Sequence, residues 1–179
     1  MRYLANDGAP SSQMIGSDIL EGFWQVGYDL FQDKDRFQAP FYQADVFDKK
    51  STLWTQLHDV DIIYMGSFLH VFDWDEQLQA LELVVHLSKP GSLVSICQIG
   101  VQSDGRSFTT GWKNNTRKQF FHDTQTVNKL FSELGRRTGS EWNVMASTSP
   151  LSAVLLEDRD RNWMGENARY LMVEAVRHR

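Results

Sequence analysis

The 179-residue chain is predicted to be an α/β domain with a mostly parallel sheet. Short apolar segments alternate with segments of helical periodicity along most of its length. Acidic or small residues follow the apolar segments, where a parallel strand would end. The last two apolar segments, 141–147 and 169–176, have no helical pattern between them, so we expect an antiparallel hairpin at one edge of the sheet.

The N-terminal third begins with a helix end. Residues 1–6 are typical of last helical turns, with Gly8 and Pro10 just beyond them. Strands are predicted at 13–19, 41–46 and 61–65, with a helix after the first strand and a weak helix at 53–57. The third strand is apolar on both faces, which indicates a buried parallel strand.

The clearest predicted helix follows Asp73, which can cap it together with Glu76 in a capping box. Residues 88–91 are expected to end this helix in a turn, before a strand at 92–99. Polar residues 100–119 are interpreted as a loop. Asp123 then begins a last helix, and a charged loop is expected around 157–162.

Composition excludes several classes of function. A net charge of −5 disfavours a general nucleic-acid binder. No apolar run approaches the roughly 20 residues of a membrane span, and residues 1–7 are not a signal peptide. Cys97 is the single cysteine and cannot form an internal disulfide, which favours a cytoplasmic location. No histidine pairing typical of a metal site occurs, so no metal is expected.

Three successive strand ends carry residues suited to a nucleotide-like ligand. Asp18 could accept hydrogen bonds from ribose hydroxyls, and Asp45 from an adenine amino group. Small residues after the third strand, at Ser67, would leave space for the rest of the ligand. Taken singly, Asp18 is equally well explained as a helix cap and Asp45 as a turn residue. Their recurrence at neighbouring strand ends favours a binding site.

Several segments carry a resemblance to a known family. Residues 87–93, Leu-Ser-Lys-Pro-Gly-Ser-Leu, are similar to the turn before the fifth strand of class I S-adenosylmethionine-dependent methyltransferases. Residues 61–70 are similar to the fourth strand of that family and the loop after it. Residues 16–19, 27–33, 44–48 and 67–74 together resemble fungal methyltransferases of secondary-metabolite clusters, including those that make meroterpenoids.

The resemblance implies a Rossmann-like sheet and S-adenosyl-L-methionine as cofactor. It implies that Asp18 and Ile19 hold the ribose, Asp45 and Val46 the adenine, and Gly66 and Ser67 the methionine part. The acceptor would be a small organic molecule, for which relatives that act on carboxyl or hydroxyl oxygens are models, and the sequence leaves open whether oxygen, nitrogen or carbon is methylated. Neither a nucleic acid nor a membrane is expected as a partner.

The chain departs from the family at its start, because the glycine-rich first strand should lie just before Met1. Residues 1–179 are therefore expected to form a single, N-terminally incomplete domain. The missing strand would lie between strands 13–19 and 61–65. A catalytically inactive, truncated relative is thus the alternative to an active enzyme. A nicotinamide-dependent enzyme is a second alternative, and exposed sheet edges favour self-association, for instance as a homodimer.

Other candidate residues are interpreted mainly as structural. His70 could act as a base, but a wall residue is favoured, because methylation of a carboxylate needs no base. Trp74 and Cys97 are expected in the core. The aromatic residues 108, 112, 120 and 121 form either a lid beside the acceptor or a packed connector. No catalytic residue is identified from the sequence.

Overall fold

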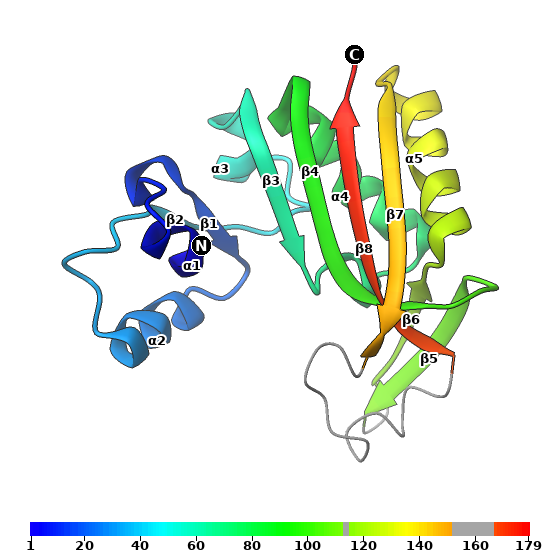
Figure 1. Cartoon of the computed structure of the whole chain (residues 1–179), viewed down its shortest axis with the longest axis horizontal. Coiled ribbons are helices and arrows are strands. Elements are labelled where there is room, and N and C mark those ends of the chain that lie inside the picture. The colour runs from blue at the N-terminus through cyan, green and yellow to red at the C-terminus, as the bar shows by residue number, and fades with distance from the viewer. Residues whose placement is uncertain (113–114, 152–166) are drawn as a thin grey trace. The chain divides into compact units, whose positions relative to one another are not determined.

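A computed structural model describes residues 1–112, 115–151 and 167–179. The charged loop expected at 157–162 lies outside this part. The chain divides into two compact units, residues 1–57 and 58–179, which are called unit 1 and unit 2 and are described separately (Figure 1).

Unit 1 is built around a two-stranded parallel sheet. Its elements in chain order are α1 (Arg2–Asn6), η1 (Ser11–Gln13), β1 (Gly16–Asp18), α2 (Gly22–Phe31), β2 (Phe41–Gln43) and α3 (Thr52–Thr55). β1 and β2 pair in parallel, with Gly16 opposite Phe41 and Asp18 opposite Gln43. Both strands are shorter than predicted, since residues 11–13 form a 3-10 turn and residues 44–46 leave the ladder.

Aromatic packing holds unit 1 together. The Trp24 ring of α2 stacks on Phe41 of β2 with centroids 5.0 Å apart. Gly16 of β1 lies directly against this ring, where any side chain would overlap it. The guanidinium of Arg2 contacts Trp24 and also pairs with Asp33 at 2.6 Å. α1 is thereby tied to the end of α2.

Unit 2 contains a four-stranded sheet in the order β3-β4-β8-β7. Its elements in chain order are β3 (Val60–Gly66), η2 (Leu69–Val71), α4 (Trp74–Leu87), β4 (Ser88–Val101), β5 (Arg106–Trp112), β6 (Asn115–Phe121), α5 (Thr124–Thr138), β7 (Trp142–Pro150) and β8 (Ala168–Arg177). β3 and β4 are parallel, whereas β8 runs antiparallel to both β4 and β7. Three of the four strands therefore point the same way, and the antiparallel pair at one edge is confirmed.

The core of unit 2 lies on one face of this sheet, beneath α4 and α5 (Figure 1). Both predicted helices begin with capping boxes, at Asp73 and at Asp123. Side chains with essentially no solvent exposure are contributed by both helices and by the central strands: Leu78, Leu81, Val94, Ile96, Leu130, Leu134 and Leu171.

The prediction that β3 is buried on both faces is wrong. Ile62 is 66% exposed and Tyr64 65% exposed, whereas Met65 is buried. Within the described residues β3 pairs with β4 on one side only. The apolar side chains of Ile62 and Tyr64 would need another element packed on them to be buried. An apolar sequence does not show whether such an element covers the strand.

Two other boundaries differ from the prediction. β4 begins at Ser88, and the Lys-Pro-Gly segment is an irregularity within it, with Gly91 at φ +93°. The polar segment 100–119 is mostly not a loop, because β5 and β6 form an antiparallel hairpin from Arg106 to Phe121. Its threonine and aromatic residues favour strands despite the polar composition.

Candidate functional site

In unit 1, the ends of two parallel strands bring Asp18 and Asp45 to one edge. The amide of Ala44 donates to the carbonyl oxygen of Asp18 at 3.0 Å, which fixes the two strand ends side by side. Both carboxylate side chains are exposed. The predicted neighbours also lie here, Ile19 exposed and Val46 half-buried. This edge therefore presents two hydrogen-bond acceptors beside two apolar side chains.

Each carboxylate also closes its own turn. Asp18 Oδ1 accepts from the Leu20 amide at 2.9 Å, and Asp45 Oδ1 from the Phe47 amide at 2.9 Å. Asp18 is not the cap of α2, whose preceding residue is Glu21. An ionised carboxylate has about four lone-pair directions, so each aspartate keeps acceptor capacity for a ligand.

In unit 2, Gly66 and Ser67 lie at the carboxyl end of β3. Ser67 has φ +52°, and its amide donates to the carbonyl of Cys97 at 2.7 Å. The phenol oxygen of Tyr64 lies 2.8 Å from the position of a Cβ on Gly66, so a larger residue would displace this ring. Gly66 and Ser67 are both exposed. The structure thus places them where a parallel sheet binds ligands.

His70 lies in η2, just beyond this strand end. Its amide donates to Gln98 Oε1 at 3.1 Å, and its ring packs edge-on against Phe121 with centroids 6.0 Å apart. The ring is half-buried, and Nδ1 is buried without a hydrogen-bond partner among the described residues. Burial lowers the pKa of His70, so the imidazole is neutral at pH 7.

A buried polar network joins the loop after η2 to the hairpin. Gln77 Nε2 donates to the carbonyls of Phe72 at 3.0 Å and Phe120 at 2.9 Å. Its Oε1 lies 2.9 Å from His122 Nε2, which must therefore carry the proton. Burial lowers the pKa of His122 to about 4. Sequence reasoning missed this network, although a glutamine on the apolar face of a helix was a usable signal.

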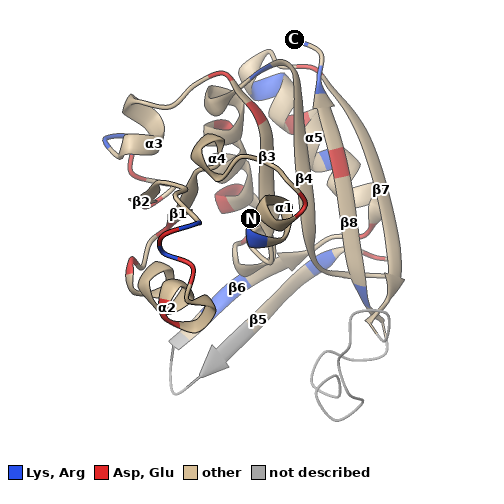
Figure 2. Cartoon of the chain, turned by 60° about the vertical axis from the view of Figure 1, so that its left-hand side comes forward, with Lys and Arg blue, Asp and Glu red and all other residues tan. Residues whose placement is uncertain are grey.

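The β5–β6 hairpin is packed onto the same region by aromatic rings. Phe108 and Phe121 have centroids 4.8 Å apart, and Trp74 contacts Phe120 at 5.0 Å. Trp74 is half-buried, and so is Cys97. The side chain of Trp112 lies outside the described part. The hairpin also carries the basic residues Arg106, Arg117 and Lys118, and Figure 2 draws part of its ribbon in blue.

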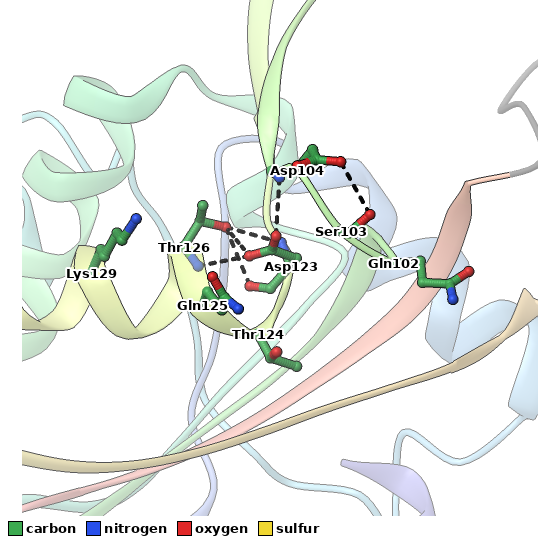
Figure 3. A pocket seen from close by; sticks show the side chains of 9 residues that line it. Gln102, Ser103, Asp104, Asp123, Thr124, Gln125, Thr126 and Lys129 are labelled. Carbon is green, nitrogen blue, oxygen red and sulfur yellow. Dashed lines mark hydrogen bonds between the residues drawn. The ribbon is translucent and has the colours of Figure 1, made fainter.

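A separate polar hollow of about 330 Å³ lies at the start of α5 (Figure 3). None of the predicted site residues lines it. Asp123 Oδ1 accepts from the Thr126 amide at 2.7 Å and Oδ2 from Gly105 at 3.1 Å. Burial would raise the pKa of Asp123, but these hydrogen bonds outweigh it and lower the pKa. The helix end is thus already capped by an anion, and we assign it no ligand.

Within the described ranges, no group of three or more His, Cys, Asp or Glu side chains is arranged to hold a metal ion. None of the described helices has the length and apolarity needed to cross a membrane.

The fold has many solved counterparts. It resembles Burkholderia thailandensis 1,6-didemethyltoxoflavin-N1-methyltransferase, with a TM-score of 0.64, 15% identity and coverage of 99% of this chain and 65% of that one. It also resembles the [4+2]-cyclase SpnF, with a TM-score of 0.68, 12% identity and coverage of 98% and 70%. The fold is therefore that of S-adenosylmethionine-dependent methyltransferases, as the sequence motifs implied.

Sequence comparison identifies fungal relatives, although no family model matches the chain. O-methyltransferase phiE of a fungal species is 33% identical over 147 residues, which are 80% of this chain and 48% of phiE. Methyltransferase ausD of Aspergillus calidoustus is 37% identical over 77% of this chain and 50% of its own length. Methyltransferase adrK of Penicillium rubens is 36% identical over 80% of this chain and 52% of its own.

These relatives confirm the resemblance to fungal methyltransferases. The chain spans about half the length of the curated relatives that it matches.

Proposed function

We propose that this chain binds S-adenosyl-L-methionine and serves methyl transfer to a small organic acceptor in fungal secondary-metabolite biosynthesis. The observation that carries the proposal is the pair of exposed carboxylates at adjoining parallel strand ends, Asp18 and Asp45, in a methyltransferase fold. Two acceptors beside Ile19 and Val46 match a ligand with ribose hydroxyls, an adenine amino group and a flat ring.

Residue roles follow from this chemistry. Asp18 and Ile19 would hold the ribose, and Asp45 and Val46 the adenine. Gly66 and Ser67, at the carboxyl end of β3, would line the methionine part. Because the sulfonium cofactor supplies an already activated methyl group, the protein's task is to align donor and acceptor and to exclude water.

Calorimetric titration with S-adenosylhomocysteine and with NAD tests this proposal. We expect the methyltransferase ligand to bind more tightly, whereas tighter NAD binding would favour a nicotinamide enzyme instead.

Asp18→Ala and Asp45→Ala, measured in the same titrations, test the residue roles. We expect each to weaken S-adenosylhomocysteine binding, because a lost hydrogen bond costs about 1.5–3 kcal/mol with a charged acceptor and about 0.5–1.5 kcal/mol when neutral. Asp18 should have the larger effect, since two hydroxyls would face it. Asp48→Ala, a neighbouring turn aspartate, is the control. Unchanged affinity in both variants would leave Asp18 and Asp45 as turn residues only.

The alternative is a catalytically inactive relative. The observation that fits it is β3, which pairs on one side only within the described residues. Transfer of labelled methyl groups, measured in parallel with cofactor binding, separates the alternatives: binding without turnover on any acceptor supports the inactive form.

A further inference from the structure

Residues 67–72, which follow β3 and are called the β3 loop, are held tightly against β4. Ser67 has a left-handed backbone conformation, with φ +52°, which is uncommon for a residue that carries a side chain. Its amide donates to the carbonyl of Cys97 in β4 at 2.7 Å. Leu69, two residues further on, is 1% exposed. The surroundings of Ser67 therefore impose a conformation that the residue itself does not favour.

A buried glutamine fastens the β3 loop at a second point. Gln98 Oε1 accepts a hydrogen bond from the amide of His70 at 3.1 Å. Gln98 follows Cys97 directly in β4, so two successive residues of one strand hold the loop. Cys97 acts through its backbone and Gln98 through its side chain. The loop can move away from β4 only when both hydrogen bonds break.

Gln98 occupies a core position of its strand. Val94 and Ile96, which point to the same face of β4, have essentially no exposed surface, and Gln98 is 1% exposed. An apolar side chain would fill this position without the free-energy cost of burying an amide. The hydrogen bond to His70 offsets part of that cost. A glutamine at this position is therefore explained by the shape that it gives to the β3 loop.

A second buried glutamine, Gln77 of α4, bonds to the far end of the same loop. Its Nε2 donates to the carbonyl of Phe72 at 3.0 Å. That carbonyl also accepts a hydrogen bond from the Phe120 amide at 2.9 Å, so β6 holds this end of the loop as well. The contact of Gln98 lies three residues from Ser67 and that of Gln77 five. Gln98 is thus better placed to control the position of Ser67.

We propose that Gln98 is a positioning residue for the cofactor: it fixes the β3 loop, which presents Ser67 to the methionine part of S-adenosyl-L-methionine. This inference rests on the proposed function, in which Gly66 and Ser67 line that part. The amide of Ser67 is already bonded to Cys97, and its side chain is exposed. A hydroxyl can donate to a carboxylate and accept from an ammonium group. Holding the hydroxyl in place before binding reduces the entropy that binding would cost.

Two ligands that differ only in the methionine part test the proposal. S-adenosylhomocysteine carries the amino and carboxyl groups, whereas 5′-methylthioadenosine has the nucleoside and the sulfur without them. Calorimetric titration of the full chain with each ligand gives the ratio of the two affinities. We expect the unsubstituted chain to bind S-adenosylhomocysteine more tightly.

Gln98→Met keeps the length of the side chain but removes the acceptor oxygen. We expect it to lower the ratio of affinities roughly 2- to 13-fold, the effect of one hydrogen bond between ligand and loop, and to leave the affinity for 5′-methylthioadenosine unchanged. Gln98→Glu keeps an acceptor oxygen in either protonation state and should restore most of the ratio. If Gln98→Met fails to fold, Gln98→Asn, whose oxygen is withdrawn by one methylene group, is measured in its place.

Gln77→Met is the matched control, since it also removes a buried side-chain amide from the same region. It should lower the melting temperature at least as much as Gln98→Met, because Gln77 also bonds to Phe120 and His122. It should leave the ratio of affinities unchanged. If Gln98 served stability alone, Gln98→Met would change the melting temperature and not the ratio.

The same titrations separate this inference from the function on which it rests. A ratio that is unchanged in Gln98→Met, or that falls equally in Gln77→Met, rejects the positioning role and leaves the proposed cofactor binding intact. An unsubstituted chain that binds neither ligand rejects the proposed function, and the role of Gln98 with it.

Discussion

The longest helix of unit 1, α2 with 10 residues, and helix α4 of unit 2, with 14 residues, are stabilised very differently. α2 in unit 1 buries none of its residues, and Phe23 and Leu30 are 67% and 71% exposed. α4 in unit 2 buries half of its length, and Leu78 and Leu81 have no exposed surface. Unit 2 thus has a core of its own. Unit 1 presents the apolar surface of a helix without a partner inside the unit.

This difference bears directly on function. The carboxylates proposed to hold the cofactor, Asp18 and Asp45, come from unit 1. Gly66 and Ser67, which are proposed to line the methionine part, come from unit 2. We therefore expect Gly66 and Ser67 to be better ordered than Asp18 and Asp45, because local stability follows buried apolar contact.

The largest expected effect comes from adding a strand, which would change the stability of unit 1 and the affinity of the cofactor site. Within the described residues, β1 pairs with β2 alone and β3 with β4 alone, so both sheets have an edge available. We expect a form extended upstream by a glycine-rich strand and helix to bind S-adenosylhomocysteine about 100-fold more tightly, or more. The gain corresponds to several added hydrogen bonds of about 0.5–1.5 kcal/mol each. Calorimetry and thermal melting of both lengths provide the measurement.

Equal melting cooperativity and equal affinity in the two lengths would show that neither sheet edge needs a partner. The proposed cofactor roles of the residues at the ends of β1, β2 and β3 would then be wrong.

Truncating matched apolar residues tests the core of each unit. Leu81→Ala should lower the free energy of unfolding of unit 2 by about 2–5 kcal/mol, because it leaves a cavity beneath α4. Phe23→Ala in α2 should change stability by about 0.5 kcal/mol or less, as is usual for exposed positions. Urea denaturation of both variants measures the difference. A large loss in Phe23→Ala would mean that α2 is covered in solution.

Acid should weaken unit 2 through His122. Its pKa is lowered to about 4 by burial, whereas an unfolded histidine has a pKa of about 6.5. The unfolded chain therefore binds more protons, and stability is complete above about pH 6.5 and falls as the pH drops towards 4. The shift corresponds to about 3 kcal/mol at pH 4. Asp123 beside it moderates the effect by raising this pKa.

Urea denaturation of unit 2 between pH 7 and pH 4 measures this slope. His122→Gln should lose most of it, although it is less stable at pH 7 because it alters the bond to Gln77. His58→Gln, at an exposed position, should keep the slope. A slope that survives in His122→Gln would assign the acid sensitivity to carboxylates.

Local signals predicted much of this molecule. Asp73 and Asp123 marked both helix starts, because capping depends on residues within one turn. The alternation of strands and helices predicted the parallel sheet, and the resemblance predicted the fungal relatives. Longer-range features were not visible. The hairpin at residues 106–121 depends on pairing across its turn, and the exposure of Ile62 depends on what covers β3.

The candidate site likewise has one part that could be predicted from the sequence and one part that could not. Asp18 and Asp45 could be placed at strand ends from spacing alone, and the structure brings those ends together. The environment of His70 could not be predicted, since Gln98 and Phe121 reach it from positions 28 and 51 residues further along the chain. The cofactor roles of Asp18, Ile19, Asp45, Val46, Gly66 and Ser67 stay predictions.

The smallest expected effect concerns the interaction of Arg2 with Asp33 in unit 1. Arg2 forms a bidentate pair with Asp33, at 2.6 and 3.1 Å, and its guanidinium lies within 4.8 Å of the ring centroids of Phe31 and Phe37. The hydrogen bonds from Arg2 lower the pKa of Asp33. Because unit 1 buries little apolar surface on α2, this one side chain links α1, α2 and the segment before β2.

Arg2→Leu should therefore speed hydrogen exchange of the α1 and α2 amides and leave the α4 and α5 amides of unit 2 unchanged. Arg2→Lys keeps the charge but not the planar, bidentate geometry, so its exchange rates should lie between those of Arg2→Leu and the unsubstituted chain. Arg36→Leu, a neighbouring cation without the paired geometry, is the control. If exchange in α4 rises as much as in α2, the two units unfold together, and the contrast in stability between unit 1 and unit 2 does not apply in solution.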